Sequence, residues 1–231
     1  MDQDLLTLLR RVDTPTVCNA IEVVQGKRGF QGFTRGTMEA SAPTAPAMVG
    51  YAVTAQLAGV APPEEHPTTI RARRMAYYKA MYDASKPSVA VIEDVDYPNC
   101  VAAYWGEVNS TIHKSFGMSG ALTNGVLRDL GDLPPGFPIL AGSIGPSHGF
   151  AHIRTLCQPV EVKGLTVCQG DLIHADRHGA VVIPPEVVPA LAAAIGKLQA
   201  TERVILNPAR QGFPDFDALE SAWAAFEASR T

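Results

Sequence analysis

The sequence predicts a mixed α/β protein, and three stretches carry this prediction. Residues 48–57 and 88–92 are apolar enough to form buried strands, and the second is a continuous apolar run typical of buried strands in mixed α/β proteins. Residues 68–85, which lie between them, have the pattern of a helix. A length of 231 residues and a hydrophobic content of 46% are sufficient for a real core.

Composition excludes some classes of partner. A net charge of −4 and an isoelectric point near 5.8 argue against binding to nucleic acid or to an anionic membrane. Apolar runs stay below the ~18 residues of a membrane helix, and residues 1–4 lack the design of a signal peptide. We therefore expect a cytoplasmic protein. The four cysteines have no C-x-x-C spacing, so they suggest neither a zinc site nor a disulfide framework. They are Cys18, Cys100, Cys157 and Cys168.

The N-terminal third predicts two helices and a loop. A first helix is predicted over residues 4–12, which carry four leucines. This helix should end at Asp13-Thr14-Pro15-Thr16, which also provides the N-cap of a second helix over 17–24. Residues 26–46 are rich in Gly, Thr, Ser and Pro and predict a surface loop. In the helix at 68–85, the expected core side consists of Ile70, Met75, Tyr78 and Met81.

The middle of the chain predicts a helix followed by a strand. Residues 105–116 place Val108, Ile112 and Phe116 on one helix face, and Gly117 is a natural C-terminal cap. Residues 93–96, Glu-Asp-Val-Asp, follow the strand at 88–92. Strand ends are where α/β folds place ligands, although a solvated acidic turn explains these residues equally well.

The C-terminal part predicts a short strand at 137–141, two hairpins and two helices. Residues 159–167 alternate around Lys163-Gly164, and residues 170–184 form a second hairpin pattern whose acids and histidines fix turns. A long helix over 185–206 should stop at Asn207-Pro208. The helix at 215–229 carries an aromatic stripe that packs on the core or on a neighbouring subunit. We expect an α/β domain over 1–206 and a helical extension over 207–231.

Residues 120–130 are the most informative stretch. An apolar run ends there in Arg128 and Asp129, side by side. Neighbouring side chains of a strand point to opposite faces, so both can serve one site only where the strand breaks into a turn. Asn124-Gly125 is also a hairpin signal, and a hairpin followed by an exposed Arg and a capping Asp is the alternative.

Three motifs together resemble the RraA-like family. They are Gly106-Glu107 at a helix start, Gly125-x-x-Arg128-Asp129, and Gly170-Asp171-x-x-x-Ala175-Asp176-x-x-Gly179 before an apolar strand. The family includes metal-dependent (class II) pyruvate aldolases and a regulator of ribonuclease E activity. The resemblance implies an α/β/β/α sandwich of the swivelling-domain type, assembled as a homotrimer or hexamer with sites between subunits.

The resemblance also implies roles for particular residues. Asp129 would ligate Mg²⁺ or Mn²⁺ directly, Glu107 would reach the metal through water, and Arg128 would hold the keto acid. Backbone groups around Gly106, Val108 and Asn109 would bind the substrate carboxylate. Glu202 is the candidate for a glutamate that reaches the neighbour's metal site. The implied activity is a lyase that cleaves a small 2-oxo acid, by retro-aldol cleavage or oxaloacetate decarboxylation, and releases pyruvate.

The residue chemistry suits this activity. A hard divalent cation can polarise the keto oxygen, and one direct carboxylate with outer carboxylates suits Mg²⁺ or Mn²⁺ better than Zn²⁺. Arg128 would add a permanently charged guanidinium group whose fixed donors can bind the keto acid. A water relayed by Glu107 could remove the hydroxyl proton in a retro-aldol cleavage. No lysine has the setting of a Schiff-base aldolase, which favours a metal mechanism.

Two departures leave alternatives open. Val108-Asn109 stands where the aldolases generally have two bulky aliphatic residues, and Asn19 stands where an acidic residue is common. A non-catalytic regulator is therefore one alternative, and a lyase or hydrolase of another substrate is a second. Histidines could line the pocket of the latter: His148, His152 and His178. The spacing of His148 and His152 could place both on one helix face, although Gly149 argues against a helix.

Overall fold

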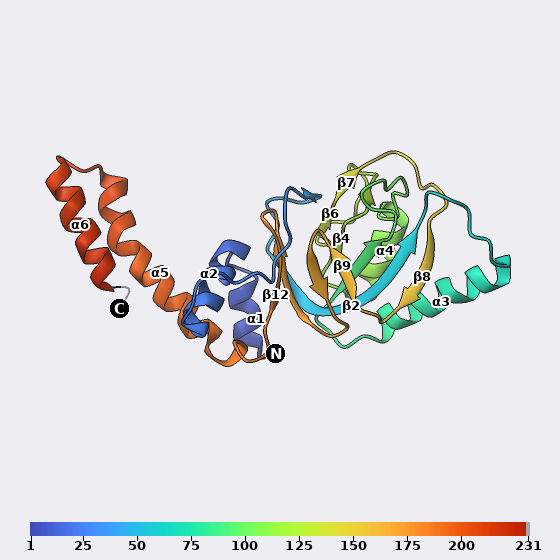
Figure 1. The fold of residues 1–231 in the computed structure, drawn as a ribbon, viewed down its shortest axis with the longest axis horizontal. Coiled ribbons are helices and arrows are strands. Elements are labelled where there is room, and N and C mark those ends of the chain that lie inside the picture. The colour runs from blue at the N-terminus through green and yellow to red at the C-terminus, as the bar shows by residue number, and fades with distance from the viewer. Residues whose placement is uncertain (230–231) are drawn as a thin grey trace. The chain divides into compact units, whose positions relative to one another are not determined.

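The computed structural model describes residues 1–229 and divides the chain into two compact units. The first unit contains Met1–Pro15 and Gln31–Pro185, and the second contains Thr16–Phe30 and the C-terminal segment from Glu186. Helices α1 (Gln3–Leu9) and α2 (Thr14–Gln25) lie near the N-terminus, as the sequence predicts. Figure 1 shows the course of the chain.

An eight-stranded mixed sheet forms the frame of the first unit. Its strand order is β1-β6-β4-β3-β2-β11-β12, and β8 also pairs with β2. Neighbours from β2 to β6 run parallel, and the other pairs run antiparallel. The strands are β1 (Glu39–Ala40), β2 (Met48–Ala58), β3 (Ser88–Asp94), β4 (Ala121–Thr123), β6 (Ile139–Ala141), β8 (His152–Leu156), β11 (Leu172–Asp176) and β12 (Gly179–Ile183).

The long strand β2 makes the sheet curl. Its first half pairs with β11 and its second half pairs with β8, while β3 pairs along its other edge. A break in register between Gln56 and Leu57 interrupts the pairing with β8, as expected where a strand bends. β2 therefore runs through the middle of the curled sheet (Figure 1).

Helices cover one face of the sheet and a hairpin covers the other. Tyr77 and Met81 of α3 (Pro67–Asp83) belong to one buried cluster together with Ile92 of β3. Val91 of the same strand belongs to a second cluster, which includes Val160 from the hairpin of β9 (Val160–Val162) and β10 (Leu165–Val167). Strand β3 is thus buried on both faces, which explains its continuous apolar sequence. The predicted mixed α/β class is confirmed.

Two helices bury faces that differ from the predicted ones. In α3, Tyr77 is buried, whereas Met75 of the expected core side is 42% exposed. In α4 (Glu107–Ser115), Val108 is 65% exposed and the buried residues are Ser110 and His113. Hydrophobic spacing misleads in α4 because hydrogen bonds satisfy the polar groups on its buried face.

The turns follow their local sequence. Lys163 and Gly164 have φ angles of 51° and 78° and connect β9 to β10, as predicted. β11 and β12 form the second predicted hairpin. Asn124-Gly125 is not a hairpin turn, because the next strand, β5 (Val126–Leu127), pairs with β7 (Ser143–Ile144) instead of returning along β4.

The second unit is mainly helical. α5 (Val188–Gln211) and α6 (Phe216–Ser229) pack against each other, and Thr201 donates a hydrogen bond to the Ser229 carbonyl. The predicted stop at Asn207-Pro208 is wrong, because α5 continues through Pro208 and ends at Gly212, whose φ is 82°. A proline disfavours a helix interior because it removes one N–H donor and its ring crowds the carbonyl four residues earlier, but Pro208 lies in the last turn of α5. The predicted boundary between the α/β domain and the helical extension, between residues 206 and 207, falls inside α5.

Candidate active site

The candidate site is the corner at which β5 ends and α4 begins. Leu127 of β5 forms a bridge with Trp105, and the Arg128 N–H donates to the Trp105 carbonyl over 2.8 Å. These backbone contacts hold the end of β5 against the residue that precedes Gly106. Two of the three motifs in the sequence therefore meet in space.

A turn brings the Arg128 and Asp129 side chains to the same site. Asp129 has a φ of 56°, in the left-handed region that Asp and Asn tolerate better than most residues. Its Oδ2 accepts a hydrogen bond from the Glu107 N–H over 3.1 Å, and its Oδ1 lies 3.7 Å from Arg128 Nη1. The Asp129 carboxylate thus lies at the positive end of α4.

Glycine at position 106 leaves space for two charged side chains. A Cβ atom at this position would lie 2.4 Å from Asp129 Oδ2, closer than real Cβ contacts allow, and 3.0 Å from Arg128 Nε, which is a tight contact. Its φ of −134° is ordinary, so backbone strain plays no part in the choice of glycine. The missing side chain lets both charged groups approach the start of α4.

The corner keeps unused hydrogen-bonding capacity. Arg128 Nε is buried and has no partner among the described residues. The Val108 and Asn109 N–H groups lie in the first turn of α4, where a helix supplies no acceptor of its own. The side chains of Arg128 and Asp129 are about a third exposed, at 33% and 31%. An anion can therefore find donors here without first breaking a strong internal contact.

The carboxylates at this corner fit a hard divalent ion. Asp129 is partly exposed and Glu107 is exposed, and both provide oxygen ligands. Within residues 1–229, no three His, Cys, Asp or Glu side chains converge into a site that could hold a metal. An ion that keeps several waters, such as Mg²⁺ or Mn²⁺, needs only one or two protein carboxylates. Glu202 lies exposed on α5, in a groove of the second unit beside Asn19.

Sequence reasoning missed the polar layer beneath α4. Asn109 Oδ1 accepts a hydrogen bond from the Tyr78 hydroxyl over 2.6 Å, and Asn109 Nδ2 donates to the Tyr104 carbonyl over 2.7 Å. His113 Nε2 lies 2.6 Å from the Tyr77 hydroxyl. No local signal could have revealed these pairs, because the tyrosines of α3 lie more than 30 residues from their partners.

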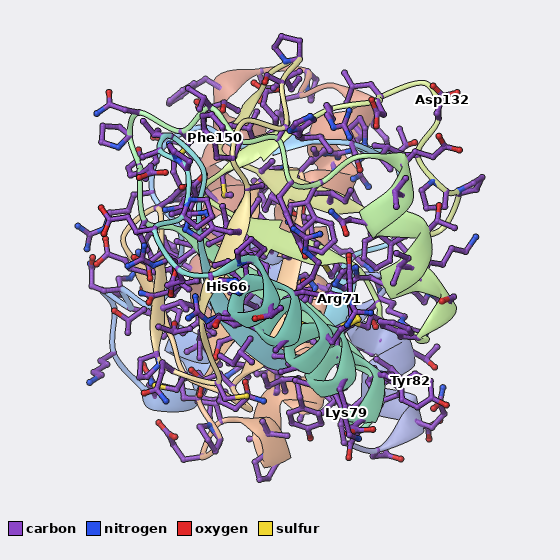
Figure 2. All side chains as sticks on the ribbon, turned by 90° about the vertical axis from the view of Figure 1, so that its right-hand side faces the viewer. His66, Arg71, Lys79, Tyr82, Asp132 and Phe150 are labelled. Carbon is purple, nitrogen blue, oxygen red and sulfur yellow. The ribbon has the colours of Figure 1, made fainter. Side chains whose placement is uncertain are left out.

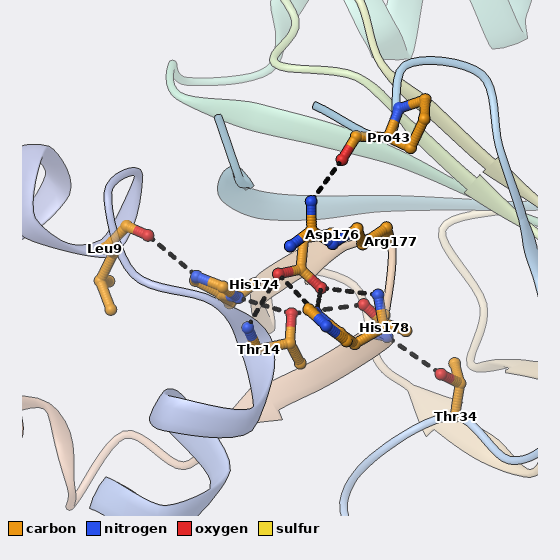
Figure 3. A network of polar contacts seen from close by, with 10 residues as sticks. Leu9, Thr14, Thr34, Pro43, His174, Asp176, Arg177 and His178 are labelled. Atoms are coloured by element: carbon orange, nitrogen blue, oxygen red, sulfur yellow. Dashed lines mark hydrogen bonds and ion pairs between the residues drawn. The ribbon is translucent and has the colours of Figure 1, made fainter. Parts of the chain in front are cut away.

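The remaining histidines do not lie on a common helix. His148 is exposed in a loop, and His152 belongs to β8 and is buried, with its Nδ1 2.8 Å from the Phe150 carbonyl. His174 and His178 belong to the second predicted hairpin (Figure 3). His174 Nε2 lies 2.9 Å from the Leu9 carbonyl, and the His178 N–H donates to Asp176 Oδ1. Hydrogen bonds thus fix this hairpin, as predicted.

The acidic cluster at the end of β3 is part of the folded structure. Asp94 is 1% exposed, and the Asn124 side chain bonds both its backbone N–H and its carbonyl. Burial raises the pKa of the Asp94 carboxyl. Asp96 Oδ2 accepts hydrogen bonds from the Gly59 and Val60 N–H groups. A solvated acidic turn is therefore the wrong description for Asp94, whereas Asp96 does lie in a turn and is partly exposed.

Sequence comparison identifies the class of protein that this fold and corner represent. The profile of the RraA-like family, described as Aldolase/RraA, matches residues 14–182. The chain therefore belongs to the RraA-like family, as its three motifs predict. The matched range includes the whole of the candidate corner.

One curated relative has a name that agrees with this assignment. A protein of Halalkalibacterium halodurans with the provisional name 4-hydroxy-4-methyl-2-oxoglutarate aldolase is 31% identical over 112 residues, which are 48% of this chain and 52% of the relative. The chain spans little more than half the length of the curated relatives it matches.

Solved structures support the fold. An uncharacterized protein of Pseudomonas syringae pv. tomato is 21% identical, with a TM-score of 0.69 and coverage of 97% of this chain and 94% of that one. Streptomyces coelicolor RraAS2, described as an unusual member of the RNase ES inhibitor RraA family, is also 21% identical, with a TM-score of 0.64 and coverage of 88% and 94%. None of the described helices has both the length and the apolar character needed to cross a membrane.

Proposed function

We propose that this protein is a divalent-metal-dependent lyase that cleaves a small 2-oxo acid and releases pyruvate. The observation that carries the proposal is the convergence of Arg128 and Asp129 on the start of α4, where the Glu107 N–H and Asp129 Oδ2 are 3.1 Å apart. The family description and the provisional aldolase name of one relative support the same reaction class.

The chain's own groups suit the recognition of a 2-oxo acid. The guanidinium of Arg128 is always charged and offers planar donors that match a carboxylate or a keto oxygen. Its Nε, which has no hydrogen-bond partner within residues 1–229, is adjacent to Gly106, where a Cβ would lie only 3.0 Å away. The Val108 and Asn109 N–H groups, at the positive end of α4, can donate hydrogen bonds to a carboxylate.

A metal fits beside this anion site. Asp129 and Glu107 would hold Mg²⁺ or Mn²⁺, which when bound supplies a Lewis acid that polarises the keto oxygen. In a retro-aldol cleavage, Glu107 accepts the proton of the substrate hydroxyl, directly or through water. The carbon–carbon bond then breaks, and its electron pair moves toward the keto group, whose developing charge Arg128 stabilises. Oxaloacetate loses carbon dioxide and needs no base for that step.

Pyruvate release from oxaloacetate and from 4-hydroxy-4-methyl-2-oxoglutarate, with Mg²⁺ or Mn²⁺, tests the proposal. Asp129→Asn retains an acceptor for the Glu107 N–H and tolerates a positive φ, but it removes the charge. We expect kcat/KM to fall at least ~100-fold, as when one key electrostatic group is removed from an active site. Asp129→Ala should be equally inactive.

Asp132→Asn is the matched control. Asp132 is exposed three residues further along the same turn and is labelled in Figure 2. Its substitution should leave turnover unchanged. Equal activity of wild type and Asp129→Asn would contradict the proposal. A folded wild-type protein without turnover of either acid would instead favour a non-catalytic regulator.

The proposal extends to the assembly. We infer a homotrimer or hexamer in which Glu202 of one copy reaches the metal of its neighbour. Light scattering measures the assembly, and Glu202→Gln should weaken the activation by Mn²⁺ without changing the oligomeric state. An unchanged Mn²⁺ dependence would remove Glu202 from the site.

A further inference from the structure

The Asn109 side chain is a bridge between three segments. Its Oδ1 accepts from the Tyr78 hydroxyl of α3 over 2.6 Å, and its Nδ2 donates to the Tyr104 carbonyl over 2.7 Å. Asn109 itself lies in the first turn of α4, three residues after Gly106. The amide is therefore held at both ends and ties the start of α4 to a neighbouring helix and to the segment that leads into it.

A buried histidine fixes the backbone of the same residue. His113 Nδ1 lies 2.6 Å from the Asn109 carbonyl, and His113 Nε2 lies 2.6 Å from the Tyr77 hydroxyl. Because a carbonyl can only accept, Nδ1 carries the proton and Nε2 accepts from Tyr77. His113 and Tyr77 are both 0% exposed. Side chain and backbone of Asn109 are thus anchored independently.

We propose that Asn109 is a positioning residue, which together with Tyr78 orients the first-turn N–H groups of α4 toward the carboxylate of the 2-oxo acid. The inference rests on the proposed function. Helix ends fray when nothing holds them. At this helix start, the N–H groups of the first turn must face the same point as Arg128 for all of them to bind one small anion. The bridge holds that geometry before the ligand arrives.

The expected kinetic effect is on binding. The carboxylate next to the keto group takes no direct part in the bond that breaks, so we expect it to keep its contacts from ground state to transition state. Losing such contacts raises KM and leaves kcat nearly unchanged. Loss of one neutral hydrogen bond corresponds to a change of about two- to tenfold in affinity.

Tyr78→Phe, which removes one hydroxyl group, is the first test. With oxaloacetate and Mg²⁺ as the probe, KM should rise about two- to tenfold, the range of one lost hydrogen bond. Tyr82→Phe is the matched control, because Tyr82 lies one turn further along α3, is 65% exposed, and has no hydrogen-bond partner for its hydroxyl among the described residues. Figure 2 labels Tyr82, which lies at the C-terminal end of α3. The KM of the Tyr82→Phe variant should equal that of the wild type.

A double variant tests whether the two residues act as one unit. Asn109→Leu removes both bonds of the amide and should raise KM at least as much as Tyr78→Phe. If Tyr78 acts only through Asn109, the double variant should be no worse than Asn109→Leu alone. Additive effects, or an equal rise in KM for Tyr82→Phe, would overturn the inference. So would a fall in kcat at constant KM.

Amide hydrogen exchange provides a readout that needs no turnover. The Ser110 N–H makes the first bond of the helical ladder, to the Gly106 carbonyl over 3.1 Å. Tyr78→Phe should speed its exchange several-fold and leave exchange in β2 unchanged. Unchanged exchange would refute the anchoring role even if the wild type had no lyase activity. Absent turnover combined with faster exchange would refute the proposed function and the carboxylate role, while the anchoring of α4 would stand.

Discussion

The starts of α2 and α4 are built in the same way. Asp176 Oδ2 accepts a hydrogen bond from the Thr14 N–H, the first of α2, over 3.0 Å. Asp129 Oδ2 accepts from the Glu107 N–H, the first of α4, over 3.1 Å. In both cases a carboxylate from a distant turn caps the positive end of a helix.

The carboxylates of Asp176 and Asp129 differ in the number of hydrogen bonds that they accept. Asp176 also accepts from the His178 N–H over 2.8 Å and contacts the His178 ring (Figure 3). Burial alone raises the pKa of Asp176, but the hydrogen bonds from His178 and Thr14 outweigh it and hold the pKa below its ordinary value. For Asp129 Oδ1, in contrast, the only polar partner within residues 1–229 is Arg128 Nη1, at 3.7 Å. A satisfied carboxylate fixes structure, and an unsatisfied one remains available to a ligand.

The buried histidines beneath these helix starts should make the fold sensitive to acid. Burial lowers the pKa of His113 from 6.5 to about 4, and burial also lowers the pKa of His174. Between pH 6.5 and 4 the unfolded chain therefore binds protons that the folded chain does not, so stability falls as the pH is lowered. His113 alone should remove about 3 kcal/mol of unfolding free energy across this window. Urea unfolding at several pH values measures this loss of unfolding free energy. A His113 imidazole that titrates near pH 6.5 in the folded protein would contradict the prediction.

Gly106→Ala tests the close packing at the candidate site, where β5 ends and α4 begins. The new Cβ would meet Asp129 Oδ2 at 2.4 Å, so the carboxylate must move. We expect pyruvate release to fall about 100-fold, as for a displacement of about 1 Å in an active site. Gly196→Ala is the control, because a Cβ there has nothing within 4 Å and should stabilise α5 by about 0.5–1 kcal/mol. Normal turnover in Gly106→Ala would show that Asp129 need not stay in place.

Asp176→Ala should lower the stability of the protein and leave its activity unchanged, in contrast to Gly106→Ala. It removes the cap of α2 and leaves the His178 N–H without its acceptor, so we expect a loss of about 2 kcal/mol in unfolding free energy. The kcat of pyruvate release should not change, because Asp176 belongs to the structural network. Thermal unfolding and the pyruvate assay on the same sample separate the two effects. A loss of activity without a loss of stability would erase the distinction between the two aspartates.

Local sequence predicted most of the frame. Alternating or continuous apolar runs indicated β2 and β3, and Lys163-Gly164 indicated the turn between β9 and β10. These features depend on neighbours in the chain. The face that α4 buries could not be predicted, because Ser110 and His113 are buried only where hydrogen bonds satisfy them, and the partner of His113 Nε2 lies on another helix.

Residue patterns were sufficient to predict the family, the α/β class and which residues are chemically suited to a site, including Gly106, Arg128 and Asp129. The folded structure was needed to show that Asp129 caps α4, a contact between residues 22 positions apart, and that Asn109 is held by Tyr78, 31 positions away. A pattern of residue types records what each side chain can do. Which partner it meets depends on the packing of the sheet and helices, which sums many weak contacts across the chain.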